Sequence, residues 1–146
     1  MNESDFRIKY SELIEYYQLI EMRLRGICAF FYVDDITSWF KKLDDYETDA
    51  LCALLKKVKS AQKEKRICLF SELELEELNN LRNERNYWVH ECFGGNNPIV
   101  FSHGIVKNTN YVLRISNALN LAIEWDEKLT EKSRMFRDKV KINEEF

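Results

Sequence analysis

Residues 6–31, FRIKYSELIEYYQLIEMRLRGICAFF, decide the fold class of this 146-residue chain. Apolar side chains recur there at alternating steps of four and three residues, at Phe6, Tyr10, Leu13, Tyr17, Ile20, Leu24, Ile27 and Phe31. This spacing places them on one seam of an α-helix. The seam alone fits a strand of a coiled coil, but Leu19, Phe30 and Tyr32 widen the apolar face, which favours a helix inside a bundle.

Four more helices are expected after the first. Their apolar residues recur at helical spacing over 36–43, 48–63, 71–93 and 108–140, while 99–106 is either a connecting loop or a small extended piece. Asp34 and Asp35 offer N-caps for the first of these helices, and Ser71 with Glu74 forms a capping box for the third. With only one Pro and four Gly in the chain, we expect one all-α domain over 1–146, an up-and-down bundle of four to five helices.

Composition narrows the setting of the protein. The 22 Lys and Arg and 25 Asp and Glu give a net charge of -3, so a nucleic-acid partner would require a local basic patch. Charged residues interrupt each apolar run near the N-terminus, and no segment reads as a signal peptide or a membrane span. The cysteines, at positions 28, 52, 68 and 92, have no metal-ligand spacing. We expect reduced, mostly buried thiols and a cytoplasmic protein.

The strongest local charge lies in residues 56–66, which contain six Lys or Arg and one Glu. Two interpretations remain open for it. Cations suit the C-terminal end of a helix, where they complement the helix dipole and face solvent. The same residues could instead contact phosphate groups.

The helix expected over 71–93 differs from a simple scaffold helix. On a helical wheel, its apolar arc contains Leu75, Leu78, Leu81, Trp88, Val89, Cys92 and Phe93. Arg85 projects near the middle of this arc, and Arg82 falls inside it. Asn86 and His90 are four residues apart and share a neighbouring face. A guanidinium, an amide and an imidazole are therefore grouped on the side of the helix that should face protein.

Structural roles also fit these residues. Arg85 can reach the edge of the apolar stripe or pair with a carboxylate of the bundle, and His90 can be a core histidine bonded to a carbonyl. Tyr87 and Trp88 could stack bases, although Trp88 lies on the apolar arc and fits the core better. His103 fits a surface loop, from which it could reach the same cleft.

The hexapeptide Arg85-Asn86-Tyr87-Trp88-Val89-His90 resembles the signature of the HEPN superfamily, an Arg, a polar residue, three variable residues and a His. Its place, on a late helix before a Gly-rich break and a final long helix, is similar to the family layout. Arg82-Asn83 nearly repeats Arg85-Asn86, but the spacing to the histidine favours Arg85. One toxin branch of the family carries a modified Tyr two residues after the His, where this chain has Cys92, so that form of control is not expected here.

The resemblance implies a bundle that dimerises, with two motifs meeting in a cleft. It implies a metal-independent endoribonuclease without a cofactor, the toxin or effector of a toxin–antitoxin or phage-defence system, with a cognate antitoxin or neutralising protein as a further partner. Other members of the family are non-catalytic.

The residues themselves suit such a reaction. Histidine has a pKa range suited to proton transfer, Arg85 offers a charged fork for phosphate oxygens, and Asn86 can position His90 or hold a phosphate oxygen. A two-fold dimer supplies the second histidine. We therefore expect Arg85, Asn86 and His90 to be catalytic, Arg82, Tyr87 and His103 to be candidate substrate-binding residues, and no residue to bind a metal. The alternative is a non-catalytic helical dimer that binds a protein or nucleic acid.

Overall fold

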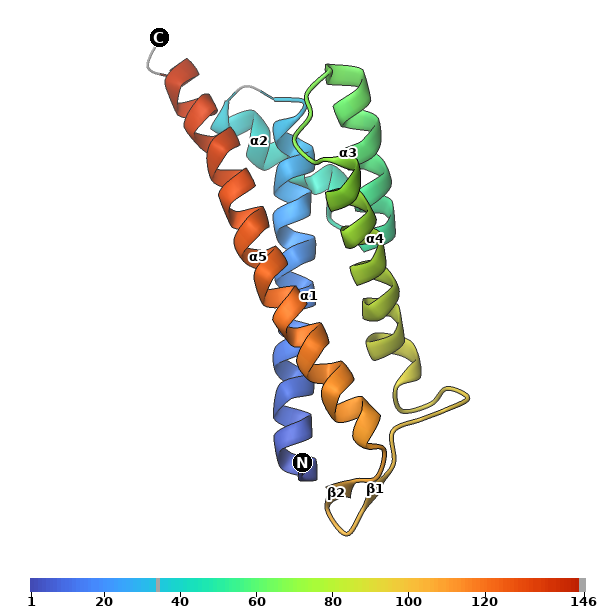
Figure 1. Cartoon of the computed structure of the whole chain (residues 1–146). Helices are drawn as coiled ribbons and strands as arrows, with labels where there is room; N and C mark the ends of the chain where they lie inside the picture. The colour runs from blue at the N-terminus through green and yellow to red at the C-terminus, as the bar shows by residue number, and fades with distance from the viewer. Residues whose placement is uncertain (34, 145–146) are drawn as a thin grey trace.

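Five α-helices and a small two-stranded sheet make up the described part of the chain (Figure 1). The computed structural model describes the backbone of residues 1–33 and 35–144, and the side chains of 1–33 and 35–138. The two long helices, α1 (Glu3–Phe30) and α5 (Thr109–Glu144), lie side by side. The pair α3 (Leu51–Lys65) and α4 (Glu72–Asn86) packs next to them. The expected all-α bundle is confirmed.

The seam of α1 supplies one side of the core. Seven of its eight apolar residues are buried, and the eighth, Tyr10, is half-buried. Asn2 caps the helix, because its Oδ1 accepts the N–H of Asp5 at 2.7 Å. The helix packs against α5, α3 and α2 of the same chain. It is therefore a bundle helix rather than an isolated strand of a coiled coil.

The connection from α1 to α3 consists of α2 (Ile36–Leu43) and a 3₁₀ turn, η1 (Asp44–Tyr46). Asp35 caps α2 through its side chain, as expected, while Asp34 lies outside the described residues. The 3₁₀ turn was not predicted. The helix α3 begins at Leu51, three residues later than the expected residue 48, after a short connection over residues 47–50. None of the eight residues of α2 is buried.

The helix α4 begins as predicted, at the capping box of Ser71 and Glu74. Ser71 Oγ accepts the N–H of Glu74 at 3.1 Å, and Glu74 Oε1 accepts the N–H of Ser71 at 3.0 Å. The apolar arc is narrower than expected, because Val89 and Phe93 are 38% and 42% exposed. Beyond the Gly-rich break, β1 (Phe101–Ser102) and β2 (Ile105–Val106) form an antiparallel hairpin, which corresponds to the extended alternative.

The last helix completes the core. Its buried residues continue the helical spacing read from the sequence, and they are Tyr111, Ile115, Ala118, Leu119, Ala122, Trp125, Leu129 and Phe136. The side chain of Val140 lies outside the described residues. No helix in the described part of the chain has an apolar stretch long enough to cross a bilayer.

All four cysteines are free, but they are less uniformly buried than expected. Cys28 and Cys92 are buried, Cys52 is half-buried and Cys68 is exposed. Burial raises the pKa of the Cys28 thiol to about 12, so this thiol stays protonated at neutral pH. The exposed Cys68 lies between α3 and α4, where the chain turns back outside the core.

Replacing Ser71 by Ala removes one half of the capping box. We expect the free energy of unfolding to fall by about 1 kcal/mol, because a helix N–H loses its acceptor. Urea unfolding followed by circular dichroism measures this change. The control is Ser60→Ala, an exposed serine inside α3, where alanine should be neutral or stabilising. Equal losses in the two variants would contradict a specific role for the cap.

Candidate functional site

The Arg85–His90 segment lies where α4 changes its geometry. The α-helix ends at Asn86, and Tyr87–Glu91 form a π-helical turn, η2. The N–H of Cys92 donates to the carbonyl of Tyr87, five residues earlier, at 3.0 Å, whereas in an α-helix it would reach the carbonyl of Trp88. No α-helix follows this turn directly, so it forms the C-terminal end of α4, where π-turns occur. This turn changes the rotation between Asn86 and His90, so the two do not stand as they would on a continuous α-helix.

Contacts from α1 support the π-turn. The hydroxyl of Tyr10 donates to the carbonyl of Trp88 at 3.0 Å, and the thiol of Cys92 donates to the same carbonyl at 3.1 Å. Burial raises the pKa of Tyr10, so its hydroxyl keeps the proton that this bond requires. The Trp88 ring is fully buried, which confirms its expected place in the core. The backbone that carries the motif is therefore fixed against the central helix.

Arg85 occupies the buried stripe of α4, as the wheel predicted. Its Nε lies 3.2 Å from Oε1 of Glu21 on α1, and the two side chains are 20% and 11% exposed. The two atoms are close but not aligned for a hydrogen bond. Glu21 also lies 3.6 Å from Nη2 of Arg25, so one buried carboxylate faces two guanidinium groups. The charge of Arg85 is compensated, although its Nε–H has no aligned acceptor.

The other two motif residues face solvent. Asn86 is exposed, and its Oδ1 lies 3.4 Å from Nη1 of Arg85, a long hydrogen bond. His90 is exposed, and within the described residues its side chain has no hydrogen bond or ion pair. His90 is therefore not a core histidine. The structure brings Arg85 and Asn86 into contact and leaves the imidazole free.

The candidate substrate-binding residues have different surroundings. Arg82 is half-buried and donates from Nε to Oδ1 of Asn79 at 3.1 Å. Tyr87 is half-buried, and the guanidinium carbon of Arg114 lies 3.5 Å from the centre of its ring. Burial raises the pKa of Tyr87, as does the neighbouring Tyr111. Much of the Tyr87 ring is already covered by the final helix.

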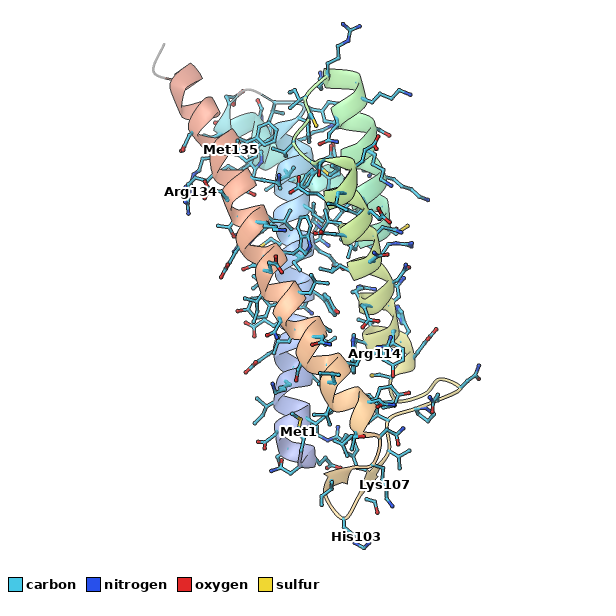
Figure 2. The ribbon with its side chains drawn as sticks, in the orientation of Figure 1. Met1, His103, Lys107, Arg114, Arg134 and Met135 are labelled. Carbon is cyan, nitrogen blue, oxygen red and sulfur yellow. The ribbon has the colours of Figure 1, made fainter. Side chains whose placement is uncertain are left out.

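His103 lies at the tip of the β1–β2 hairpin. It is exposed, its φ angle is 51°, and its side chain points away from the bundle (Figure 2). Among the described residues it contacts neither Arg85 nor His90 through a hydrogen bond or ion pair. The hairpin is tied to α1, because the carbonyl of Gly104 accepts the N–H of Glu3 at 2.7 Å. Its surroundings are those of the surface-loop histidine that the sequence favours.

Sequence reasoning missed a second ion pair beside the motif. Arg114 donates from Nη2 and Nε to both carboxylate oxygens of Glu84, at 2.7 and 3.2 Å, and its side chain points toward α4 in Figure 2. The same carboxylate accepts the indole N–H of Trp88 at 3.1 Å. Burial raises the pKa of Tyr17, with a further increase from Glu84 and opposing effects from Arg114 and Arg85. No spacing rule pairs residues of different helices, so these contacts required the structure.

A sizeable pocket of the described residues lies away from the motif. It has a volume of about 800 Å³ and lies between α1, α2 and α5, with Trp39, Phe40 and Leu43 on one wall. None of the six motif residues lines it. In the described part of the chain, no three His, Cys, Asp or Glu side chains are grouped to hold a metal ion.

The Glu21–Arg85 pair makes a prediction about stability. Glu21→Gln leaves Arg85 charged and uncompensated, whereas a Glu21→Gln, Arg85→Gln double variant removes both charges. We expect the double variant to lose less than the two single variants together, with a coupling energy of about 1 kcal/mol or more. Urea unfolding of the four proteins measures it.

The exposed pair of Glu3 and Arg7 on α1 is the matched control, because these side chains are 40% and 57% exposed and lie 3.5 Å apart. Its coupling should stay below about 0.5 kcal/mol. A coupling at Glu21–Arg85 no larger than this control would mean that the buried pair does not stabilise the fold.

Comparison of the chain with protein-family models, with curated proteins and with solved structures gives no match. A proposal for its function therefore starts from the contacts of Arg85, Asn86 and His90 described above.

Proposed function

We propose that the protein is a metal-independent endoribonuclease of the HEPN type, acting as a homodimer. The observation that carries the proposal is the exposed His90, which has no partner among the described residues and lies on a π-turn that begins two residues after the half-buried Arg85. A free imidazole can exchange protons with a bound substrate, whereas a core histidine cannot. The proposed role in the cell is that of a toxin or effector in a toxin–antitoxin or phage-defence system, neutralised by a protein partner.

The proposed reaction begins at the ribose 2′-hydroxyl. One His90 removes its proton while the oxygen attacks the adjacent phosphorus, and the bond to the 5′-oxygen breaks. The second His90, from the partner subunit's motif, gives a proton to the leaving 5′-oxygen. The products are a 2′,3′-cyclic phosphate and a 5′-hydroxyl. Each proton step by a positioned side chain contributes roughly 10²–10⁴ to the rate.

Arg85 is assigned to the charge that develops on the phosphate. Its ion pair with Glu21 fixes the guanidinium on the stripe without aligning an acceptor on Nε. Nε is buried against Glu21, but Nη2 of Arg85 has no hydrogen bond to a described residue and remains available to a phosphate oxygen. Asn86, which contacts Arg85 and is exposed, can bind a second oxygen or orient the guanidinium.

The surface next to His90 supports dimerisation. Val89 and Phe93 are exposed although they were expected in the core; Val89 lies within the motif and Phe93 three residues after it. A two-fold axis through this surface would cover both apolar side chains and bring two histidines together, because an isologous interface pairs the same patch on each subunit.

The contact between Glu21 and Arg85 favours a second candidate function. If the guanidinium serves only the bundle, the same face binds a protein partner or nucleic acid without cleaving it. The two candidates differ in whether purified protein cuts RNA.

The catalytic proposal predicts that labelled RNA is cut in excess EDTA and that DNA, which lacks the 2′-hydroxyl, is resistant. His90→Ala should reduce the rate by a factor of about 10² or more at unchanged helix content. Arg85→Lys keeps a positive charge opposite Glu21 but loses the planar fork, so it should also be severely impaired. Arg82→Ala should be milder. Phosphatase and kinase treatment of the products identifies their ends.

His103→Asn is the matched control, because it replaces the other histidine of the chain at a positive φ that Asn tolerates. Its cleavage rate should equal that of the parent. Cutting that stops in EDTA, or a His90→Ala protein as active as the parent, would refute the mechanism. A parent protein that does not cut RNA would favour the binding protein.

The dimer predicts the effect of a charge at the exposed apolar surface. Val89→Glu should shift the protein from dimer to monomer in sedimentation velocity and stop cleavage, since a buried carboxylate at the interface has no partner. Leu73→Glu, at the opposite end of α4 and 66% exposed, should do neither. A parent protein that sediments as a monomer and still cuts RNA would contradict the dimer.

A further inference from the structure

We propose that four basic residues of α3 and its C-cap hold the phosphate backbone of the RNA and lead it toward the Arg85–His90 motif. The four are Lys56, Lys59, Lys63 and Arg66, and they are called the basic stripe here. This inference rests on the proposed function, because it names a binding surface for the same substrate.

The basic stripe lies in residues 56–66, the segment of the chain with the strongest local positive charge. Six of the eleven residues in 56–66 are Lys or Arg, whereas the whole chain has a net charge of -3. All six basic residues are exposed. A polyanion approaching this chain would find its most favourable field here, because the rest of the molecule is acidic overall.

Two of the six cations are already engaged, and four are not. Lys57 forms an ion pair with Asp49, and the ammonium of Lys65 lies 5.2 Å from the ring centre of Tyr32. Within the described residues, no side chain of the basic stripe has an ion pair or a hydrogen bond. The unengaged cations are therefore the ones available to a ligand.

Their spacing places them in one row. The steps between successive members are three, four and three residues, so they follow one face of the helix. Over ten residues at 1.5 Å per residue, the row is about 15 Å long. Like charges at this spacing repel one another, so the bare helix gains nothing from them. A linear chain of phosphates would compensate the whole row.

The helix dipole does not account for the whole row. Lys63 and Arg66 lie at the C-terminal end of α3, where cations are favourable. Lys56 and Lys59 lie one or more turns before that end, and the dipole effect is confined to the last turn. The interaction of cations with the helix dipole therefore explains two of the four residues, Lys63 and Arg66, and leaves Lys56 and Lys59 unexplained.

The basic stripe lies on the flank of α3 that borders α4. Lys59, Lys63 and Arg66 line a surface pocket of about 440 Å³ together with Leu75 of α4. Figure 1 shows α3 and α4 side by side, with the chain turning back between them.

The same face of α4 continues to the motif. Leu75, Asn79, Arg82 and Asn86 follow at steps of four, three and four residues and thus share that face. A strand held by the basic stripe therefore reaches Arg82 next and then Asn86, beside Arg85. The half-buried Ile67 and Leu75 form the accessible apolar part of the pocket.

The test measures RNA binding without cleavage. In a His90→Ala background, all four residues of the basic stripe are replaced by Gln, and binding of a fluorescein-labelled oligouridine is followed by anisotropy at several salt concentrations. We expect the affinity to fall about tenfold or more at low salt. The slope of log Kobs against log salt concentration should become less negative by up to about 3, since each phosphate contact with a single strand contributes roughly 0.7.

The matched control removes four cations from other surfaces, Lys9, Lys41, Lys107 and Arg137, and has the same change in net charge. It should keep most of the affinity and the slope. Equal binding losses in the two quadruple variants, or unchanged binding in the stripe variant, would overturn the proposal. An unchanged affinity for RNA with lost affinity for an acidic protein partner would also overturn it.

The unfolding midpoint in urea checks that the stripe variant is folded. We expect only a small shift, because the relief of like-charge repulsion opposes the loss of the favourable interaction of Lys63 and Arg66 with the helix dipole. The single variant Lys59→Gln provides a second measurement, with a slope change of roughly 0.7. If the parent protein binds RNA through the stripe but does not cut it, the proposed nuclease fails while this inference holds. If the parent protein cuts RNA while the stripe variant binds RNA normally, this inference fails while the proposed nuclease holds.

Discussion

Burial of the apolar seam of α1 is the constraint on which the other elements depend. This helix packs against α5, α3, α2 and the second strand of the hairpin. Five residues of the seam have no exposed surface at all, namely Phe6, Leu13, Ile20, Leu24 and Ile27. Burying side chains of this size stabilises by about 1.5–3 kcal/mol each. The same helix also presents Tyr10 and Glu21 to the motif, so the core and the candidate site are built from one element.

The guanidinium of Arg85, on the apolar stripe of α4, loses hydration, and the carboxylate of Glu21 compensates its charge. Removing Arg85 from water is unfavourable, and Glu21 offsets this only in part, because the closest atoms are not aligned for a hydrogen bond. An apolar residue at this position would pack without that cost. Arg114 of α5 and Glu84, the residue before Arg85 on α4, instead form a bidentate pair with good geometry. The fold explains the placement of Arg85 less well than that of Arg114, and this difference underlies the proposed role of Arg85 in catalysis.

Local rules predicted most of the fold and about half of the site. The period of the apolar residues located α1 and α5, and the capping box located the start of α4, because each signal depends on residues close in sequence. The wheel also placed Arg85 on the buried stripe. It failed for Val89 and Phe93, since it assumes an unbroken α-helix. The partners Glu21 and Tyr10 could not be predicted, because the sequence carries no rule that pairs one helix with another.

Because of the π-turn, the six-residue sequence of the motif does not by itself determine how its side chains are arranged in space. A π-turn contains one residue more than the α-turn that it replaces. Consider two chains that share these six residues, of which only one has the π-turn. Their histidine side chains would point in different directions. Here the direction is set by the bond from the Cys92 N–H to the Tyr87 carbonyl, together with the hydroxyl that α1 places on the next carbonyl. The geometry of the candidate site is therefore encoded partly outside the hexapeptide, in residues that a search for the hexapeptide would not inspect.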